Sequence, residues 1–90
     1  MPTVRLLIKG KVQGVYYRAS AQERAQALGL TGWVRNTPEG DVEAVASGDQ
    51  SVIDEFIAWC HHGPRQAKVV SVEVSSLPEA RFDDFGIRRG

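Results

Sequence analysis

Apolar and polar residues alternate along the first ten positions of the chain. Val4, Leu6 and Ile8 occupy every second position, and Gly10 follows them. A period of two is typical of a β-strand with one buried face, because successive side chains point to opposite sides. We therefore expect a strand over residues 4–9 that ends at Gly10.

The spacing of apolar residues changes after the middle of the next segment. Ala21, Ala25 and Leu28 recur at helical spacing among polar residues, and Gly29 follows them. A glycine at this place can adopt the left-handed conformation that closes a helix. The pattern predicts a helix that begins near Tyr17 and ends before Gly29.

Two short segments follow, over residues 31–37 and 41–47, which together are rich in valine, threonine and tryptophan. Residues 37–40, with the sequence Thr-Pro-Glu-Gly, join them. Proline presets the dihedral angle of a turn, and glycine accepts its exit. These segments predict a β-hairpin.

A second stripe of apolar residues at helical spacing covers residues 52–60. Asp49 precedes it, and an aspartate there can cap a helix because its carboxylate accepts hydrogen bonds from first-turn amides and suits the helix dipole. Gly63 and Pro64 predict the end of this helix. The sequence therefore predicts a second helix after the hairpin.

Valines alternate with polar residues over positions 70–74, which predicts another strand, and residues 85–88 are expected to add a short edge strand. The order β-α-β-β-α-β is the split βαβ or ferredoxin-like arrangement, an α+β fold with both helices on one face of an antiparallel sheet. The third strand of this fold lies between the first two, so the carboxyl ends of the first two strands share one edge. Arg18 and Asn36 are expected to meet there.

The composition excludes several classes of protein. Ninety residues suffice for a single domain over residues 1–90, and eleven basic residues balance eleven acidic ones, so no net field recruits nucleic acid or an anionic membrane. Cys60 is the single cysteine, which rules out an internal disulfide and fits a reducing compartment. The chain has neither a leader pattern nor an apolar run near the roughly 20 residues that a bilayer requires. We expect a soluble, cytoplasmic monomer.

The segment between the first strand and the first helix carries the candidate chemistry. Residues 10–18 lead into a helix start, where about four backbone N–H groups lack partners and the dipole adds roughly half a positive charge, so an anion binds well there. Gly14 permits the positive φ that turns successive amides inward, and Arg18 offers a planar fork of donors for two phosphate oxygens. Taken alone, a solvated arginine on an ordinary connection is the commoner interpretation. The stretch also lacks the lysine and hydroxyl residue of a nucleotide P-loop.

Two segments of the chain together form a more specific pattern. The first holds Gly10, the sequence Val-Gln-Gly-Val and Arg18, and the second holds Gly-Trp-Val-Arg-Asn over residues 32–36 followed by Gly40. In both segments the chain resembles the acylphosphatase family, and the resemblance extends over nearly the whole sequence. It implies the ferredoxin-like fold and a small enzyme without metal or cofactor that hydrolyses the carboxyl–phosphate bond of acyl phosphates. The products are a carboxylate and inorganic phosphate, and the phosphate is expected to inhibit.

The same resemblance implies roles for individual residues. Arg18 would bind the phosphoryl group, and Asn36 would orient the attacking water. The implied phosphate-binding residues, which act through their amides, are Lys11, Val12, Gln13, Gly14, Val15, Tyr16, Tyr17 and Arg18. One departure lies outside these segments: Arg65 follows Pro64 where a second proline is frequent among relatives, which touches the rigidity of that loop.

Several alternatives stay open at this stage. Taken alone, Asn36 is better explained as a strand-end residue that starts the hairpin turn, and only its pairing with Arg18 favours a catalytic role. A domain with the same loop could bind a phosphorylated or carbamoylated metabolite without hydrolysing it, since fold does not settle function. An RNA-binding module of this fold is excluded, because it would carry aromatic residues on its third strand, whereas residues 41–46 contain none and the net charge is zero.

The remaining reactive residue types have simpler explanations. Cys60 is expected in the core, since its spacing from Arg65 does not match the cysteine-phosphatase loop. His61 and His62 are adjacent, so they diverge by about 100° on a helix and suit solvent better than a metal. Tyr16 and Tyr17 are expected to be packing residues, although one of them could contact the acyl portion of a substrate.

Overall fold

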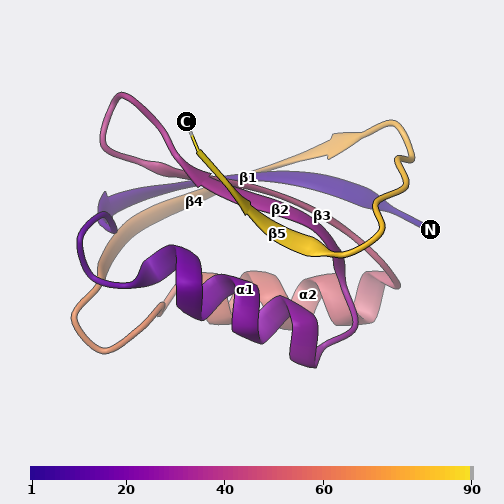
Figure 1. Cartoon of the computed structure of the whole chain (residues 1–90), viewed down its shortest axis with the longest axis horizontal. Coiled ribbons are helices and arrows are strands. Elements are labelled where there is room, and N and C mark those ends of the chain that lie inside the picture. Colours follow the sequence, from indigo (N-terminus) through magenta and orange to yellow (C-terminus); the bar gives the residue numbers. More distant parts are fainter. Residues whose placement is uncertain (90) are drawn as a thin grey trace.

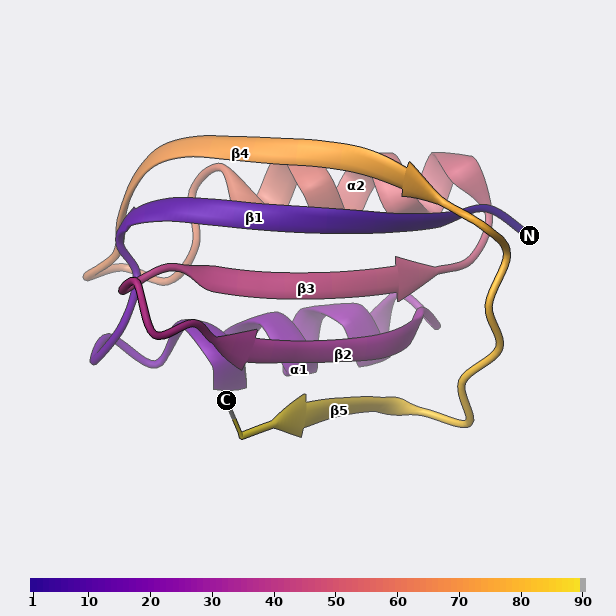
Figure 2. The ribbon, with the colours of Figure 1, turned by 90° about the horizontal axis from the view of Figure 1, so that it is seen from above.

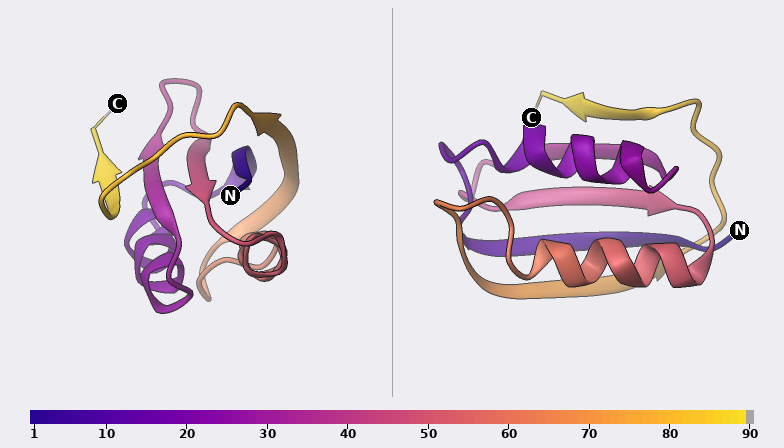
Figure 3. Two further views of the ribbon diagram at one scale, coloured as in Figure 1. Left: turned by 90° about the vertical axis from the view of Figure 1, so that its right-hand side faces the viewer. Right: turned by 90° about the horizontal axis from the view of Figure 1, so that it is seen from below.

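The computed structural model describes residues 1–89, which form two layers (Figure 1, Figure 3). Two helices, α1 (Tyr17–Ala27) and α2 (Gln50–Cys60), cover one face of a five-stranded sheet. The strands are β1 (Thr3–Lys11), β2 (Thr31–Asn36), β3 (Val42–Ser47), β4 (Lys68–Leu77) and β5 (Phe85–Arg88). The sheet order β4-β1-β3-β2-β5, seen from above in Figure 2, and the two helices confirm the ferredoxin-like arrangement predicted from the sequence.

The central strand of the sheet is β3. It runs antiparallel to both neighbours, so that Ala44 pairs with Leu6 of β1 on one side and with Val34 of β2 on the other. All residues of β3 are buried. The edge strand β5 pairs in parallel with β2, with Ile87 opposite Val34, so the sheet contains one parallel pair beside its antiparallel ones. The parallel pairing sends the end of β5 toward the same edge of the sheet as the end of β2 (Figure 2).

Gly10 does not end β1, and that prediction is wrong. The register between β1 and β4 shifts between Lys9 and Gly10, and the strand continues to Lys11, which lies opposite Lys68. Gly10 has a φ of 131°, and a Cβ added to it would lie 2.1 Å from the backbone oxygen of Lys68. A bulge with so close a backbone approach requires glycine, and it lets β1 run on to the start of the loop.

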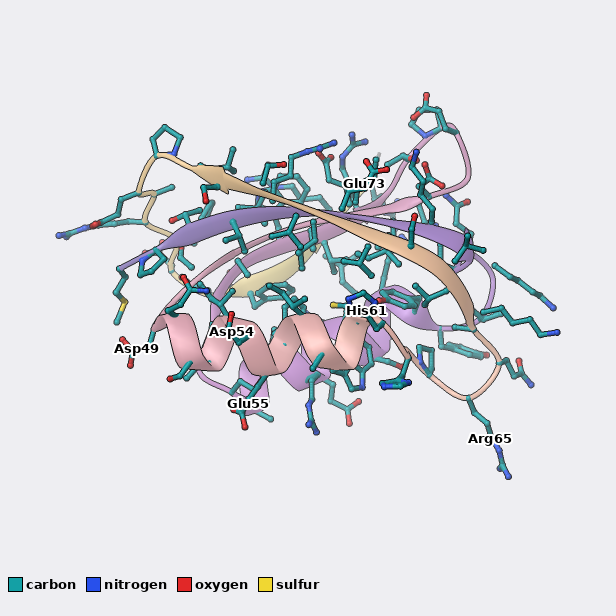
Figure 4. All side chains as sticks on the ribbon, turned by 180° about the vertical axis from the view of Figure 1, so that it is seen from behind. Asp49, Asp54, Glu55, His61, Arg65 and Glu73 are labelled. Carbon is teal, nitrogen blue, oxygen red and sulfur yellow. The ribbon has the colours of Figure 1, made fainter. Side chains whose placement is uncertain are left out.

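The start of α2 also differs from the expectation. Asp49 precedes the helix as predicted, but its carboxylate makes no capping hydrogen bond. Its backbone carbonyl accepts hydrogen bonds from the amides of Val52 at 3.0 Å and Ile53 at 2.9 Å. The Asp49 side chain lies at the N-terminus of α2 (Figure 4), where its charge interacts with the helix dipole without a hydrogen bond to the first-turn amides.

The core lies between the sheet and the two helices. Phe56 of α2 is at its centre, with its ring 5.8 Å from that of Phe85 in an edge-on arrangement and 6.2 Å from that of Trp59 in a stacked one. Cys60 is fully buried beside them, which confirms its assignment to the core. Within residues 1–89, no helix is long and apolar enough to cross a membrane.

Candidate active site

The loop between β1 and α1 takes an unusual backbone path. Gly14 has a φ of 75° and Tyr16 a φ of 62°, both in the left-handed region. Glycine adopts this conformation freely, whereas Tyr16 is the one non-glycine residue of positive φ among residues 1–89. A Cβ added to Gly14 would meet no atom within 4 Å, so this part of the loop faces open space.

Three side chains of the loop segment pack into the core and anchor the loop to it. Val12, Val15 and Tyr17 are all buried. The hydroxyl of Tyr17 donates a 2.7 Å hydrogen bond to the backbone oxygen of Cys60 at the end of α2. Burial raises the pKa of this phenol well above its ordinary value, so Tyr17 stays a neutral hydrogen-bond donor. The backbone amides, and not these side chains, are therefore the groups that the loop can offer to a ligand.

Gln13 holds the loop from the side. Its Nε2 donates hydrogen bonds to the backbone oxygens of Thr37 at 2.9 Å and Asp41 at 2.8 Å. Thr37 and Asp41 close the β2–β3 hairpin, where the amide of Thr37 donates to the oxygen of Asp41 at 2.9 Å. The Gln13 side chain thus fixes the loop against the hairpin that carries Asn36.

A cleft of about 630 Å³ opens at this edge of the sheet. Arg18, in the first turn of α1, and Asn36, at the end of β2, both line it, so the structure brings the two residues to one site. The order β1-β3-β2 explains this, since it carries the ends of β1 and β2 to the same edge. Among residues 1–89, the lining comprises Val12, Gly14, Tyr16, Tyr17, Arg18, Ala19, Asn36, Ile87 and Arg89.

Asn36 shows an unmet hydrogen-bonding requirement. Its Oδ1 is buried and has no hydrogen-bond partner among residues 1–89. Leaving a buried polar atom unpaired costs about 1–3 kcal/mol, and native structures contain few such atoms. The cleft wall therefore holds a carboxamide whose hydrogen bonding is left incomplete by the protein itself.

The cleft is electropositive. Arg18 and Arg89 line it, no acidic side chain does, and neither arginine forms a salt bridge within residues 1–89. The lining also contains no cysteine or histidine that could act as a nucleophile or a proton donor. Cys60 lies in the core, where burial raises the pKa of its thiol to about 12, and His61 and His62 are exposed beyond α2. The arrangement suits the binding of an anion and not covalent catalysis.

Known proteins match this chain along almost its full length. The acylphosphatase family model matches residues 4–87. The chain belongs to the acylphosphatase family. An acylphosphatase from Methylococcus capsulatus is 48% identical over 90 residues, covering 99% of this chain and 98% of the relative. One from Marinobacter nauticus is 53% identical over 81 residues, covering 89% and 88%. The structure of an acylphosphatase from Coxiella burnetii superposes with a TM-score of 0.94 at 39% identity, covering 97% of this chain and 92% of that one.

Within this acylphosphatase domain, the sequence-predicted loop residues divide into two groups. The residues that line the cleft are Val12, Gly14, Tyr16, Tyr17 and Arg18. Lys11 lies in β1 opposite Lys68, Gln13 bonds to the hairpin, and Val15 is buried, so these three do not line it. Their expected part in phosphate binding stays a prediction.

Three residues of the cleft were not predicted from the sequence: Ala19, Ile87 and Arg89. Ile87 and Arg89 come from the end of β5 and the residue after it, which reach the cleft because β5 runs parallel to β2. The alternation of Phe85 and Ile87 did predict a strand with one buried face. The sequence alone, however, does not determine which strand this tail pairs with. The Gln13 contact gave no signal at all, because one glutamine in a loop has many possible partners.

Proposed function

We propose that this chain hydrolyses the carboxyl–phosphate bond of acyl phosphates, using the cleft at the start of α1 and no metal or cofactor. The observation that carries the proposal is that Arg18 and Asn36, from two separate family segments, line one cleft of an acylphosphatase domain. The products are a carboxylate and inorganic phosphate. Inorganic phosphate resembles the group that the loop holds, so it acts as a competitive inhibitor.

In this proposal, the phosphoryl group lies on the loop amides and on the guanidinium of Arg18. Phosphoryl transfer has a loose transition state whose charge spreads over three equatorial oxygens, so fixed donors and correct positioning supply most of the catalysis. Each well-placed donor of this kind contributes about 2.7–4 kcal/mol to the barrier reduction. A left-handed turn at Gly14 and a planar guanidinium supply several donors without any proton transfer.

Asn36 is proposed to hold the attacking water. Its carboxamide does not ionise at neutral pH, so it cannot act as a base, and the phosphoryl oxygens accept the proton of the water instead. A small rotation of the unpaired carboxamide would let it share hydrogen bonds with a water in line with the leaving oxygen. A non-hydrolytic binding domain needs the loop but gains nothing from this group, which favours the enzyme over the binding domain.

The leaving group explains why the cleft needs no acid. A carboxylate is a weak base and departs without protonation, whereas an alkoxide needs a proton donor. The residues that line the cleft provide no carboxylic acid or imidazole for that purpose. Acyl phosphates are therefore the proposed substrates, and simple phosphate monoesters are expected to react poorly.

The protein is further proposed to act as a monomer in the cytoplasm. Its one cysteine is buried and unpaired, which fits a reducing compartment. The equal numbers of acidic and basic residues give no net charge that would drive assembly on nucleic acid or membranes. Light scattering of the purified chain tests the monomer directly.

Hydrolysis of benzoyl phosphate and acetyl phosphate by the purified chain, with a chelator present, tests the function. Arg18→Ala is expected to lose about 10²–10³-fold in kcat/KM and to weaken phosphate inhibition, because it removes donors to the phosphoryl group. Asn36→Ala is expected to lose turnover while phosphate still inhibits. Activity that disappears with the chelator, or an Asn36→Ala variant with full turnover, contradicts the proposed mechanism.

A further inference from the structure

Two apolar side chains stay exposed at the cleft. Tyr16 is 82% exposed and Ile87 is 41% exposed, and both line the same cleft as Arg18 and Asn36. Most large apolar side chains of this small domain are buried in its core. A phosphoryl group has no use for apolar surface, so these two side chains serve another part of the ligand or none.

The backbone of Tyr16 strengthens this point. Tyr16 has φ 62° and ψ 25°, a left-handed conformation that is unfavourable for a bulky side chain. Glycine or asparagine would adopt it more easily, and the exposed ring gains little packing energy in return. Backbone strain of this kind is concentrated at functional sites, which indicates that the Tyr16 ring has a function in the cleft.

The neighbouring Tyr17 cannot fill that role. Its ring is buried, it lies 5.5 Å from the ring of Trp59, and its hydroxyl is bonded to Cys60. Of the two adjacent tyrosines, only Tyr16 is free to contact a substrate. Ile87 approaches the cleft from a different element, the end of β5.

We propose that Tyr16 and Ile87 form the acyl subsite and select acyl phosphates with a flat, apolar acyl group, such as an aroyl group, over small or charged ones. This proposal rests on the proposed function and assigns its substrate class. Aromatic rings pack favourably against other rings and against aliphatic side chains, and an exposed tyrosine ring loses little conformational freedom when it does so.

The charges of the cleft favour an uncharged acyl group. Arg18 and Arg89 together carry two positive charges, and a phosphoryl dianion balances both. No further basic residue lines the cleft that would compensate a carboxylate on the acyl portion. An acyl group with its own negative charge would therefore enter without a counter-ion, whereas an apolar ring would cover the exposed surfaces of Tyr16 and Ile87.

The test compares kcat/KM for benzoyl phosphate, acetyl phosphate and succinyl phosphate. Tyr16→Asn tolerates the left-handed backbone but removes the ring, and Tyr16→Phe keeps the ring. We expect Tyr16→Asn and Ile87→Ser each to lower the benzoyl-to-acetyl ratio by about tenfold, and Tyr16→Phe to retain it. The ratio isolates the acyl contact, because any displacement of the phosphate loop affects both substrates. Val70→Ser, on β4 away from the cleft and 82% exposed, is the matched control and leaves the ratio as it is.

Two results would overturn the proposal while hydrolysis itself persists. One is a benzoyl-to-acetyl ratio unchanged in both Tyr16→Asn and Ile87→Ser. The other is a preference for succinyl phosphate that disappears in Arg89→Ala, which would make the subsite anionic. A chain that hydrolyses none of the three contradicts the proposed function instead. The subsite is then judged by binding: benzylphosphonate must bind more tightly than methylphosphonate, and Tyr16→Asn must abolish the difference.

Discussion

The side-chain nitrogen of Gln13 lies 2.9 Å from the backbone oxygen of Thr37, the residue directly after Asn36. The same amide lies 2.8 Å from the backbone oxygen of Asp41, so both of its hydrogens are used on one hairpin. The loop proposed to hold the phosphoryl group and the strand that carries Asn36 therefore depend on one side chain for their relative position. Two elements that are far apart in the sequence act as a single site.

Gln13→Glu is expected to lower kcat by about 10²-fold, because a carboxylate cannot donate to the two carbonyls and a misplacement of roughly 1 Å costs that much in a pre-positioned site. Gln13→Met, which keeps the length but lacks the donors, is expected to lose less, since it brings no charge against the carbonyls. Benzoyl phosphate kinetics and circular dichroism check both variants. Gln50→Met is the control, because it removes a side-chain amide that bonds only to Asp54 on the exposed start of α2.

Gly14→Ala probes the loop backbone in a different way. The φ of 75° penalises any residue with a Cβ by about 1–2 kcal/mol, while the added methyl meets no protein atom within 4 Å. The variant should therefore fold, with stability lowered by about that amount, and its inhibition constant for phosphate should rise because the amides turn away. Gly40→Ala, at the hairpin turn with a φ of 94° and equally open space, carries a similar backbone penalty outside the cleft. Equal phosphate inhibition in the two variants would contradict a special role for the loop amides.

The sequence predicted most of the fold because its apolar periods of two and nearly four match the elements observed. The predictions at Gly10 and Asp49 were wrong. A glycine can end a strand or form a bulge in it, and an aspartate before a helix can cap it through its side chain or only through its backbone, so the neighbouring strand or helix end decides. Arg18 and Asn36 were expected to meet because the topology alone determines which strand ends share an edge. Ile87 and Arg89 were not, since the pairing of a four-residue edge strand depends on contacts made across the whole sheet.

Tyr17→Phe tests the hydrogen bond that links α1 to α2. The 2.7 Å bond to the backbone oxygen of Cys60 is buried, and its loss leaves that oxygen without the donor. We expect a loss of about 1–2 kcal/mol in the free energy of unfolding, measured with urea. Tyr16→Phe, which removes an equivalent hydroxyl from a side chain that is exposed, should change it by less than about 0.5 kcal/mol. A Tyr17→Phe variant as stable as the parent would show that water or another group satisfies the carbonyl.

Arg65 should not limit catalysis, although it replaces the second proline that is frequent in relatives. It is exposed after α2 and points away from the rest of the molecule (Figure 4), and it does not line the cleft. Arg65→Pro is expected to leave kcat within about twofold and to change the free energy of unfolding by less than about 1 kcal/mol. Differential scanning calorimetry and benzoyl phosphate kinetics measure the two effects. A loss of activity in this variant would mean that the loop after α2 is coupled to the cleft.

The free energy of unfolding should depend on pH through Glu43. Glu43 lies on the sheet face opposite the helices and accepts hydrogen bonds from Arg5 and, at 2.6 Å, from Arg35. Its burial would by itself raise its pKa, but the two guanidiniums outweigh that effect and hold the pKa below its ordinary value. A carboxyl whose pKa is lower in the folded state stabilises the fold above its unfolded pKa, and this stabilisation disappears as the pH falls through the folded pKa.

Glu43→Gln is therefore expected to cost about 1–2 kcal/mol at pH 7, less than a fully buried pair would contribute because both arginines are partly exposed. The difference from the parent should shrink as the pH falls below about 4, where the unfolded carboxyl becomes protonated. Urea unfolding at pH 7 and pH 3 measures it. Glu73→Gln is the matched control. Glu73 lies on the sheet face opposite the helices (Figure 4), and its pair with Lys9, at 3.5 Å, is well exposed, so its removal should change the free energy of unfolding little at either pH. If the two variants lose equal stability at pH 7, the two-arginine contact of Glu43 is no stronger than an ordinary surface pair.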